Sequence, residues 1–219
     1  MIRFESLTKT FPAPGGRKRI VDGLTLSIPA RRAVALLGRN GAGKSTLLQL
    51  VAGNLKPDRG RVVCDGTVSW QVGLSGAFHP DLTGAQNARF VAHVHGVDAA
   101  TLAGFVAEFS ELGPHFDMPV RTYSQGMKAR LTFGLSMGIA FDTYLVDEVT
   151  AAGDAAFREK SRALLRDRIE RAGAIVVSHN MSDLRDICDS ALVLEHGTAR
   201  YYDDLEQAIV AHRANLGLS

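Results

Sequence analysis

The stretch GRNGAGKST carries the clearest chemistry in this sequence, because its glycines, lysine and hydroxyl groups are spaced for holding phosphates. It matches the pattern G-x-x-x-x-G-K-[S/T], in which backbone N–H groups surround phosphates at the positive end of the following helix. Lys44 would reach the β- and γ-phosphates, and the Ser45 hydroxyl suits a Mg²⁺ ion. The residues of this phosphate loop are Gly38, Arg39, Asn40, Gly41, Ala42, Gly43, Lys44, Ser45 and Thr46. The sequence therefore predicts a site for a nucleoside triphosphate and Mg²⁺.

Two acids and a histidine follow other apolar stretches of the chain. TYLVDE ends in Asp147 and Glu148, and AIVVSH ends in His179. Adjacent strand residues point to opposite faces, so the two carboxylates would have different roles. We expect Asp147 to hold Mg²⁺ and Glu148 to orient and deprotonate the attacking water. Because ligands of open α/β sheets bind at the carboxyl ends of strands, we expect His179 to contact the γ-phosphate.

The elements around these residues predict an α/β fold. RAVALLG, directly before the phosphate loop, is a continuous apolar run typical of a strand buried on both faces. Further strands alternate with helices, which indicates a mostly parallel sheet. Two N-terminal strands, IRFESLTKTF and RIVDGLTLSIP, are predicted to be antiparallel and joined by the loop PAPGGRK. We expect one domain over residues 1–219, with a helical segment inserted at about residues 82–140.

Composition and charge exclude several classes of protein. The chain has 25 basic and 23 acidic residues, a net charge of +2, so no nucleic-acid partner is expected. No apolar run approaches the roughly 20 residues that a membrane-spanning helix needs. The first residues lack the apolar segment of a signal peptide. We therefore expect a cytosolic protein, which leaves docking on a membrane protein open.

The turn TYSQGMKARL precedes a helical pattern without offering a nucleophile, a base or a metal ligand. Ser124 is a suitable helix N-cap, and Gly126 would allow close approach of a phosphate. From these residues alone, the turn is the start of a helix and nothing more.

Taken together, GRNGAGKST, YSQGM, LVDE, AAGD and SH resemble, in this order, the ATP-binding subunits of ABC transporters. The resemblance covers the whole chain. It implies an ATPase that uses ATP and Mg²⁺, and a homodimer in which each copy completes the other's site. The signature residues that would contact the γ-phosphate bound by the second copy are Tyr123, Ser124, Gln125, Gly126 and Met127. Asp154 would bridge the two copies, and Phe11 would stack on adenine, unless Phe11 is a loop residue that packs on the core.

Two positions depart from the pattern of this family. Gln125 stands where the first of two adjacent signature glycines is usual. In AFHPDLTG, His79 occupies the place of the glutamine expected shortly before LT. A histidine can still form a hydrogen bond near Mg²⁺. Gln71 is an alternative, although it lies early for the motif spacing.

Longer stretches resemble one branch of the family, the ATPases of bacterial capsular polysaccharide exporters, with O-antigen and teichoic acid exporters as relatives. These stretches are VSWQVGLSGAFHPDLTG, EFSELGPHFDMPVRTYSQGM and LTFGLSMGIAFDTYLVDEVTAAGD. Some relatives carry an added C-terminal domain, and we expect none after Ser219. The resemblance implies a peripheral protein on the cytoplasmic face of the bacterial inner membrane. A separate membrane-spanning permease would handle the polysaccharide and dock in a groove with Trp70, Phe78, Phe90 and residues 116–120 as candidates.

Three alternatives remain: the ATPase of a lipid exporter, the ATPase of an importer, and an ABC ATPase outside transport. The sequence disfavours the last, because it shows neither the heptad repeats of repair proteins nor a second phosphate loop.

Overall fold

The computed structural model describes residues 1–72, 78–147 and 154–217, which form two compact units. The α/β unit consists of Met1–Gln71, Phe141–Glu148 and Ile169–Ser219. The helical unit consists of Val72–Ala140 and Val149–Arg168.

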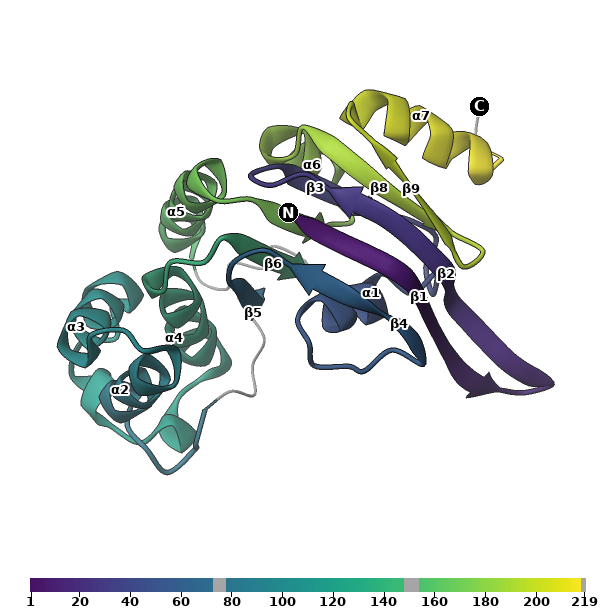
Figure 1. The fold of residues 1–219 in the computed structure, drawn as a ribbon. Helices are drawn as coiled ribbons and strands as arrows, with labels where there is room; N and C mark the ends of the chain where they lie inside the picture. The colour runs from purple at the N-terminus through teal and green to yellow at the C-terminus, as the bar shows by residue number, and fades with distance from the viewer. Residues whose placement is uncertain (73–77, 148–153, 218–219) are drawn as a thin grey trace. The chain divides into compact units, whose positions relative to one another are not determined.

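The central sheet of the α/β unit has six strands. They are β3 (Ala33–Leu37), β5 (Val68–Val72), β6 (Thr143–Asp147), β7 (Ala174–Val177), β8 (Ser190–Glu195) and β9 (Thr198–Tyr202). Their order is β5-β6-β7-β3-β8-β9 (Figure 1). β3 is parallel to β7 and β8, β6 is parallel to β7, and β9 is antiparallel to β8. All of β3 is buried, as a strand covered on both faces requires. The mostly parallel sheet predicted from the sequence is confirmed.

A second sheet is antiparallel and has the order β2-β1-β4. Its strands are β1 (Ile2–Ala13), β2 (Gly16–Ile28) and β4 (Arg59–Cys64). The expected loop PAPGGRK is wrong in extent, because the two strands stay paired as far as Ala13 and Gly16. A tight turn is possible there since Gly15 has a φ of 85°, which a glycine adopts without a steric penalty. The longer pairing places Phe11 opposite Lys18.

The hydrophobic core of the α/β unit joins both sheets to α1 (Lys44–Val51). Phe4 of β1, Leu47 and Leu48 of α1, and Leu192 of β8 are at most 1% exposed. Replacing one such leucine by alanine costs roughly 2–5 kcal/mol, because a cavity remains. This packing fixes the start of α1, and with it the phosphate loop. Two further helices of the unit are α6 (Met181–Ile187) and α7 (Leu205–Asn215).

The helical unit contains α2 (Gly84–His95), α3 (Ala99–Ser110), α4 (Gln125–Gly138) and most of α5 (Ala155–Arg171) (Figure 1). Two short 3₁₀ helices, Gly113–Asp117 and Val120–Thr122, connect α3 to α4. The N-caps Thr83 and Asp98 and the predicted N-cap Ser124 each accept a hydrogen bond from the backbone of the following helix. Thr83 and Gln86 form a reciprocal capping box. The unit thus begins ten residues before the expected insert, at Val72, and includes Val149–Arg168 as well.

Candidate active site

The phosphate loop lies between β3 and α1, as predicted, and its backbone requires glycine at two positions. Gly43 precedes α1 with a φ of 109°, and a Cβ atom there would lie 2.2 Å from Ile20 Cγ2. A Cβ atom at Gly38 would lie 2.6 Å from the carbonyl oxygen of Leu194. The loop therefore packs closely against neighbouring strands at Gly38 and Gly43. Such a loop suits an anion at the start of a helix.

A cavity of about 530 Å³ adjoins the loop, entirely within the α/β unit. Its size is within the usual range for small-molecule sites. The predicted residues that line it are Phe11, Asn40, Gly41, Gly43, Lys44, Ser45, Thr46, Asp147 and His179. The fold thus brings together the phosphate loop, one of the two acids, the histidine and the aromatic residue expected at adenine. Glu148 lies outside the described residues.

Lys44 is the central cation of this cavity. Its Nζ donates to the carbonyl oxygens of Gly38 at 2.7 Å and Arg39 at 3.2 Å. Burial lowers the pKa of Lys44, and the nearby charge of Asp147 acts in the opposite direction. Asp147 and Ser45 line the same cavity and offer a carboxylate and a hydroxyl oxygen. Oxygen donors of this kind suit Mg²⁺, so the residues present fit the expected metal–nucleotide complex.

The remaining predicted loop residues face two further cavities of the same unit. Gly38 and Arg39 line a cavity of about 420 Å³, which they share with Asn40, Lys44 and His179. Ala42 lines a smaller one of about 220 Å³. His179 follows β7 and precedes α6, whose N-cap Asn180 accepts from the Ser182 N–H at 2.9 Å. The predicted position of His179 at a strand end is therefore confirmed.

Sequence reasoning missed Lys18 and Ile20 in the main cavity, and His212 and Leu216 of the α7 region in the second. Lys18 Nζ donates to the carbonyl oxygen of Gly41 at 2.7 Å. The signal that could have found it is its register opposite Phe11, which is hidden when PAPGGRK is assigned to a loop. Burial, with the charge of Lys44, lowers the pKa of His212. No local motif marks His212.

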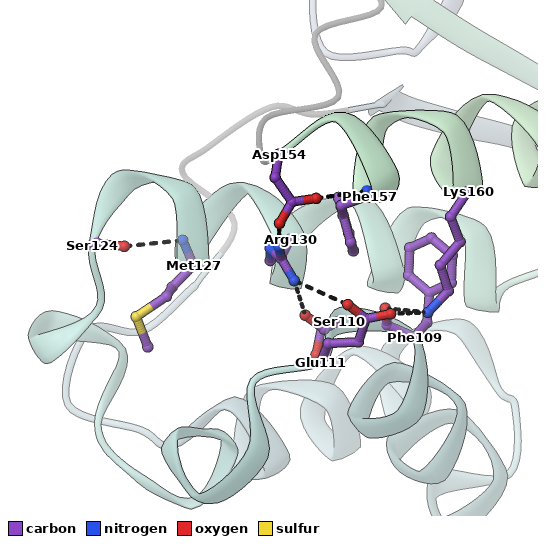
Figure 2. Close-up of polar contacts among 9 residues, drawn as sticks. All are labelled: Phe109, Ser110, Glu111, Ser124, Met127, Arg130, Asp154, Phe157 and Lys160. Carbon is purple, nitrogen blue, oxygen red and sulfur yellow. Dashed lines mark hydrogen bonds and ion pairs between the residues drawn. The ribbon is translucent and has the colours of Figure 1, made fainter.

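The signature residues lie at the start of α4 in the helical unit (Figure 2). Ser124 Oγ accepts from the Met127 N–H at 3.2 Å. Among the described residues, a Cβ atom built on Gly126 would meet only Ser124 Oγ, at 3.9 Å, so none of them demands a glycine there. Tyr123 is 5% exposed, and its hydroxyl donates to the carbonyl oxygen of His115 at 2.6 Å. Tyr123 therefore anchors the turn, whereas Gln125 is exposed.

Asp154 also lies in the helical unit, directly before α5. Its Oδ1 accepts from the Phe157 N–H at 2.9 Å, and its Oδ2 accepts from Arg130 Nη2 at 3.0 Å (Figure 2). The Phe157 N–H, assisted by Arg130, lowers the pKa of Asp154. Asp154 is thus an ionised, oriented and exposed carboxylate.

The two candidates for the glutamine loop belong to different units. His79 lies in the helical unit, where its Nδ1 accepts from the Asp81 N–H at 3.3 Å and its backbone N–H donates to Asn87 Oδ1 at 3.0 Å. Gln71 lies in the α/β unit on β5, next to the strand that ends at Asp147. Gln71 is 6% exposed, and its Nε2 has no hydrogen-bond partner within the described ranges. The burial of an unpaired amide favours Gln71 as the residue to test beside His79.

The candidates for a docking groove divide into packed and exposed residues. Trp70 belongs to the α/β unit and packs edge-on against Phe141, with ring centroids 5.4 Å apart. Phe116 is 7% exposed and is therefore part of the core of the helical unit. Phe90 and Met118, which are 59% and 42% exposed, remain available on the surface of that unit. Of the helices that the structure describes, none has the length and apolarity needed to cross a membrane.

Comparisons with known proteins agree with this arrangement. The family described as ABC transporter matches residues 21–151. The polysialic acid transport ATP-binding protein KpsT of Escherichia coli is 45% identical over 212 residues, 95% of each chain. The capsule polysaccharide export ATP-binding protein CtrD of Neisseria meningitidis serogroup B is 39% identical over 208 residues, 95% of this chain and 96% of CtrD.

A solved structure shows the same fold. The dimeric ATP-binding cassette MJ0796 bound to ADP and Pi has a TM-score of 0.77 and 21% identity, over 94% of this chain and 99% of the other. The α/β class with antiparallel N-terminal strands is thereby confirmed. The resemblance stated from the motifs is confirmed as well, and the chain belongs to the ATP-binding proteins of the ABC transporter family.

Proposed function

We propose that this chain is the ATP-hydrolysing subunit of an exporter that moves a capsular or related cell-surface polysaccharide across the inner membrane. The observation that carries the proposal is the identity with KpsT and CtrD, whose names specify polysialic acid transport and capsule polysaccharide export. This identity extends over nearly the full length of all three chains. A shared ATPase core alone would not favour one cargo, so the full-length similarity supports the polysaccharide class.

In the α/β unit, the phosphate loop would bind the triphosphate, and Lys44 would exchange its two carbonyl partners for phosphate oxygens. Ser45 and Asp147 would hold Mg²⁺, which offsets phosphate charge. Glu148 would orient the attacking water and accept its proton, and His179 would hold the γ-phosphate. Phe11 would stack on adenine. The reaction is ATP and water to ADP and phosphate.

Two copies would share each site. Residues Ser124–Met127 would present the start of α4 to the γ-phosphate bound by the other copy, where the helix dipole favours negative charge. The open space around Gly126 supports this role, because a phosphate can approach the backbone without a side chain between them. Asp154 would bridge the two copies. The dimeric assembly of the solved structure named above supports the same arrangement.

The partner in the membrane would be a separate permease that handles the polymer, so this chain would not touch sugar or nucleic acid. The ATPase would lie peripherally on the cytoplasmic face of the inner membrane. Phe90 and Met118 support a contact surface on the helical unit, since both are large apolar residues exposed to solvent.

The test is a chromosomal Lys44→Ala replacement in the source bacterium, followed by measurement of polysaccharide on the surface and inside the cell. We expect surface polymer to be lost and cytoplasmic polymer to accumulate, because the phosphate loop loses its cation. Lys56→Ala is the matched control, since Lys56 is exposed on the same unit and lines none of the three cavities. Unchanged surface polymer in Lys44→Ala would reject the substrate class and direct attention to importers, lipid exporters and ATPases outside transport.

A further inference from the structure

The guanidinium group of Arg130 lies where three segments of the helical unit meet (Figure 2). Its Nη2 donates to Asp154 Oδ2 at 3.0 Å, and its Nη1 donates to Glu111 Oε2 at 3.3 Å. Its Cζ atom lies 4.3 Å from the centroid of the Phe157 ring. Arg130 is on α4, fewer than two turns after Ser124. One side chain therefore connects the signature helix with the end of α3 and the start of α5.

This contact leaves the Asp154 carboxylate little rotational freedom. One oxygen caps α5 through the Phe157 N–H, and the other accepts from Arg130. Exposed ion pairs normally add little to stability, and Asp154 is 66% exposed. The guanidinium, in contrast, is planar and stacked on Phe157, a residue only 2% exposed. The main effect of this pair is therefore on position rather than on the free energy of unfolding.

The second arm of Arg130 holds the guanidinium from the opposite side. Glu111 ends α3 with a φ of 54°, and its Oε1 accepts from Lys160 Nζ at 2.6 Å. Lys160 Nζ in turn lies 4.8 Å from the centroid of the Phe109 ring. Lys160, followed by the smaller effect of Arg130, lowers the pKa of Glu111. Arg130 therefore lies between two ionised carboxylates, those of Glu111 and Asp154.

We propose that Arg130 is a positioning residue that ties Asp154 to the signature helix, so that Ser124 and Asp154 act on the partner subunit as one body. The inference rests on the proposed shared sites, in which both residues serve the other copy. Without Arg130, the first turn of α4 and the start of α5 could move independently. A displacement of about 1 Å at a site that orients reacting groups can cost about a hundredfold in rate.

The test compares Arg130→Gln, Asp154→Asn and the double variant in the complete exporter, with ATP turnover as the readout. In Asp154→Asn, the amide oxygen would still cap α5, but the charge that pairs with Arg130 would be lost. We expect each single change to lower kcat about tenfold and to leave the Kd for ATP within about twofold, because the phosphate loop is intact. The kcat of the double variant should also be about tenfold lower than that of the parent, since either single change already removes the contact between Arg130 and Asp154.

Two more variants separate positioning from general packing. Glu111→Gln removes the other carboxylate from the same guanidinium but keeps the Asp154 pair and the contact with the Phe157 ring, so we expect kcat within about twofold of the parent. Arg130→Lys retains the charge but replaces the planar fork by a single ammonium group, so kcat should be intermediate. A double variant that loses about a hundredfold, wild-type turnover in Asp154→Asn, or an equal loss in Glu111→Gln would each overturn the inference.

A separate measurement distinguishes this failure from a failure of the proposed function. Glu148→Gln should bind ATP without hydrolysing it and accumulate as a dimer on a sizing column. Suppose that this variant dimerises with Mg-ATP, and that the losses of kcat in Arg130→Gln and Asp154→Asn multiply in the double variant. In that case only the proposed role of Arg130 is wrong. If it stays monomeric even beside its membrane subunit, the shared site and the role of Arg130 are both overturned.

Discussion

Lys18 adds a positive charge to the nucleotide cavity. No sequence motif identifies this lysine as part of the site. Its Nζ is 2.7 Å from the Gly41 carbonyl oxygen and lines the same cavity as Lys44. One further charge near bound phosphates contributes on the order of 1 kcal/mol, which corresponds to about fivefold in affinity. We therefore predict that Lys18→Met raises the Kd for ATP about fivefold, as measured by titration with a fluorescent nucleotide.

Arg17→Met is the control for this prediction. The Arg17 guanidinium donates to Thr10 Oγ1 at 2.8 Å and lines none of the three cavities, although it neighbours Lys18 in sequence. The two variants should therefore differ in Kd. Equal affinities would show that Lys18 only supports the loop backbone and does not act on the phosphates.

The residues found from sequence and those missed differ in how local their signal is. Lys44 and Ser45 are recognisable because phosphate binding requires contiguous residue types at fixed spacing. Lys18 and Arg130 act through register and tertiary packing: one lies opposite Phe11 across a hairpin, and the other meets Asp154 from a different helix. No spacing rule joins positions 24 residues apart, so these contacts required the structure.

At the scale of elements, Asp58 attaches the segment between α1 and β4 to β1. Its Oδ2 accepts from the Thr10 N–H at 2.7 Å and from Thr10 Oγ1 at 2.8 Å, and its Oδ1 accepts from Lys9 Nζ at 3.2 Å. Thr10, with Lys9, lowers the pKa of Asp58 to about 2 from an ordinary value of 3.8. A carboxylate whose pKa falls on folding stabilises the native state above its unfolded pKa, and this contribution disappears as pH falls through the folded pKa.

We accordingly predict that Asp58→Asn lowers the free energy of unfolding at neutral pH. The difference from the parent should shrink between about pH 4 and about pH 2 and then vanish. Denaturant titrations of both proteins across this range measure it. Thr10→Val, which removes the hydroxyl donor but not the backbone N–H donor, should lie between them. A difference that is the same at every pH would contradict the assignment.

The type of an element can be predicted from sequence where the signal lies within a few residues. Its boundaries cannot be predicted where they depend on pairing with another strand. The caps Thr83, Asp98 and Ser124 follow from the sequence because a capping side chain acts within one helical turn. The prolines and glycines of PAPGGRK indicate a loop, yet only its centre turns and the rest stays in β1 and β2. In this hairpin, pairing between the two strands determines where they end more than the proline and glycine content does.

At the scale of the whole molecule, a substitution at Gly126 should affect the stability of the single chain and the formation of the dimer differently. A Cβ atom there would meet no atom of the described residues closer than 3.9 Å, and alanine is favoured over glycine inside a helix by about 1 kcal/mol. Gly126→Ala should therefore keep or raise the Tm of the isolated subunit. The added methyl group would nevertheless stand between the backbone of α4 and the γ-phosphate bound by the partner. We predict at least about tenfold weaker ATP-dependent dimerisation, measured by sedimentation in the Glu148→Gln background.

Gly104→Ala provides the matched control, because Gly104 is exposed on α3 of the same unit and a Cβ atom there would meet none of the described residues within 4 Å. It should give the same gain in helix propensity and leave dimerisation unchanged. If Gly126→Ala dimerises as well as Gly104→Ala, the turn does not face a phosphate of the second copy, whatever its sequence resembles. If only Gly126→Ala loses dimerisation, its glycine is required by a second molecule, since the described residues of its own chain leave room for a Cβ atom there.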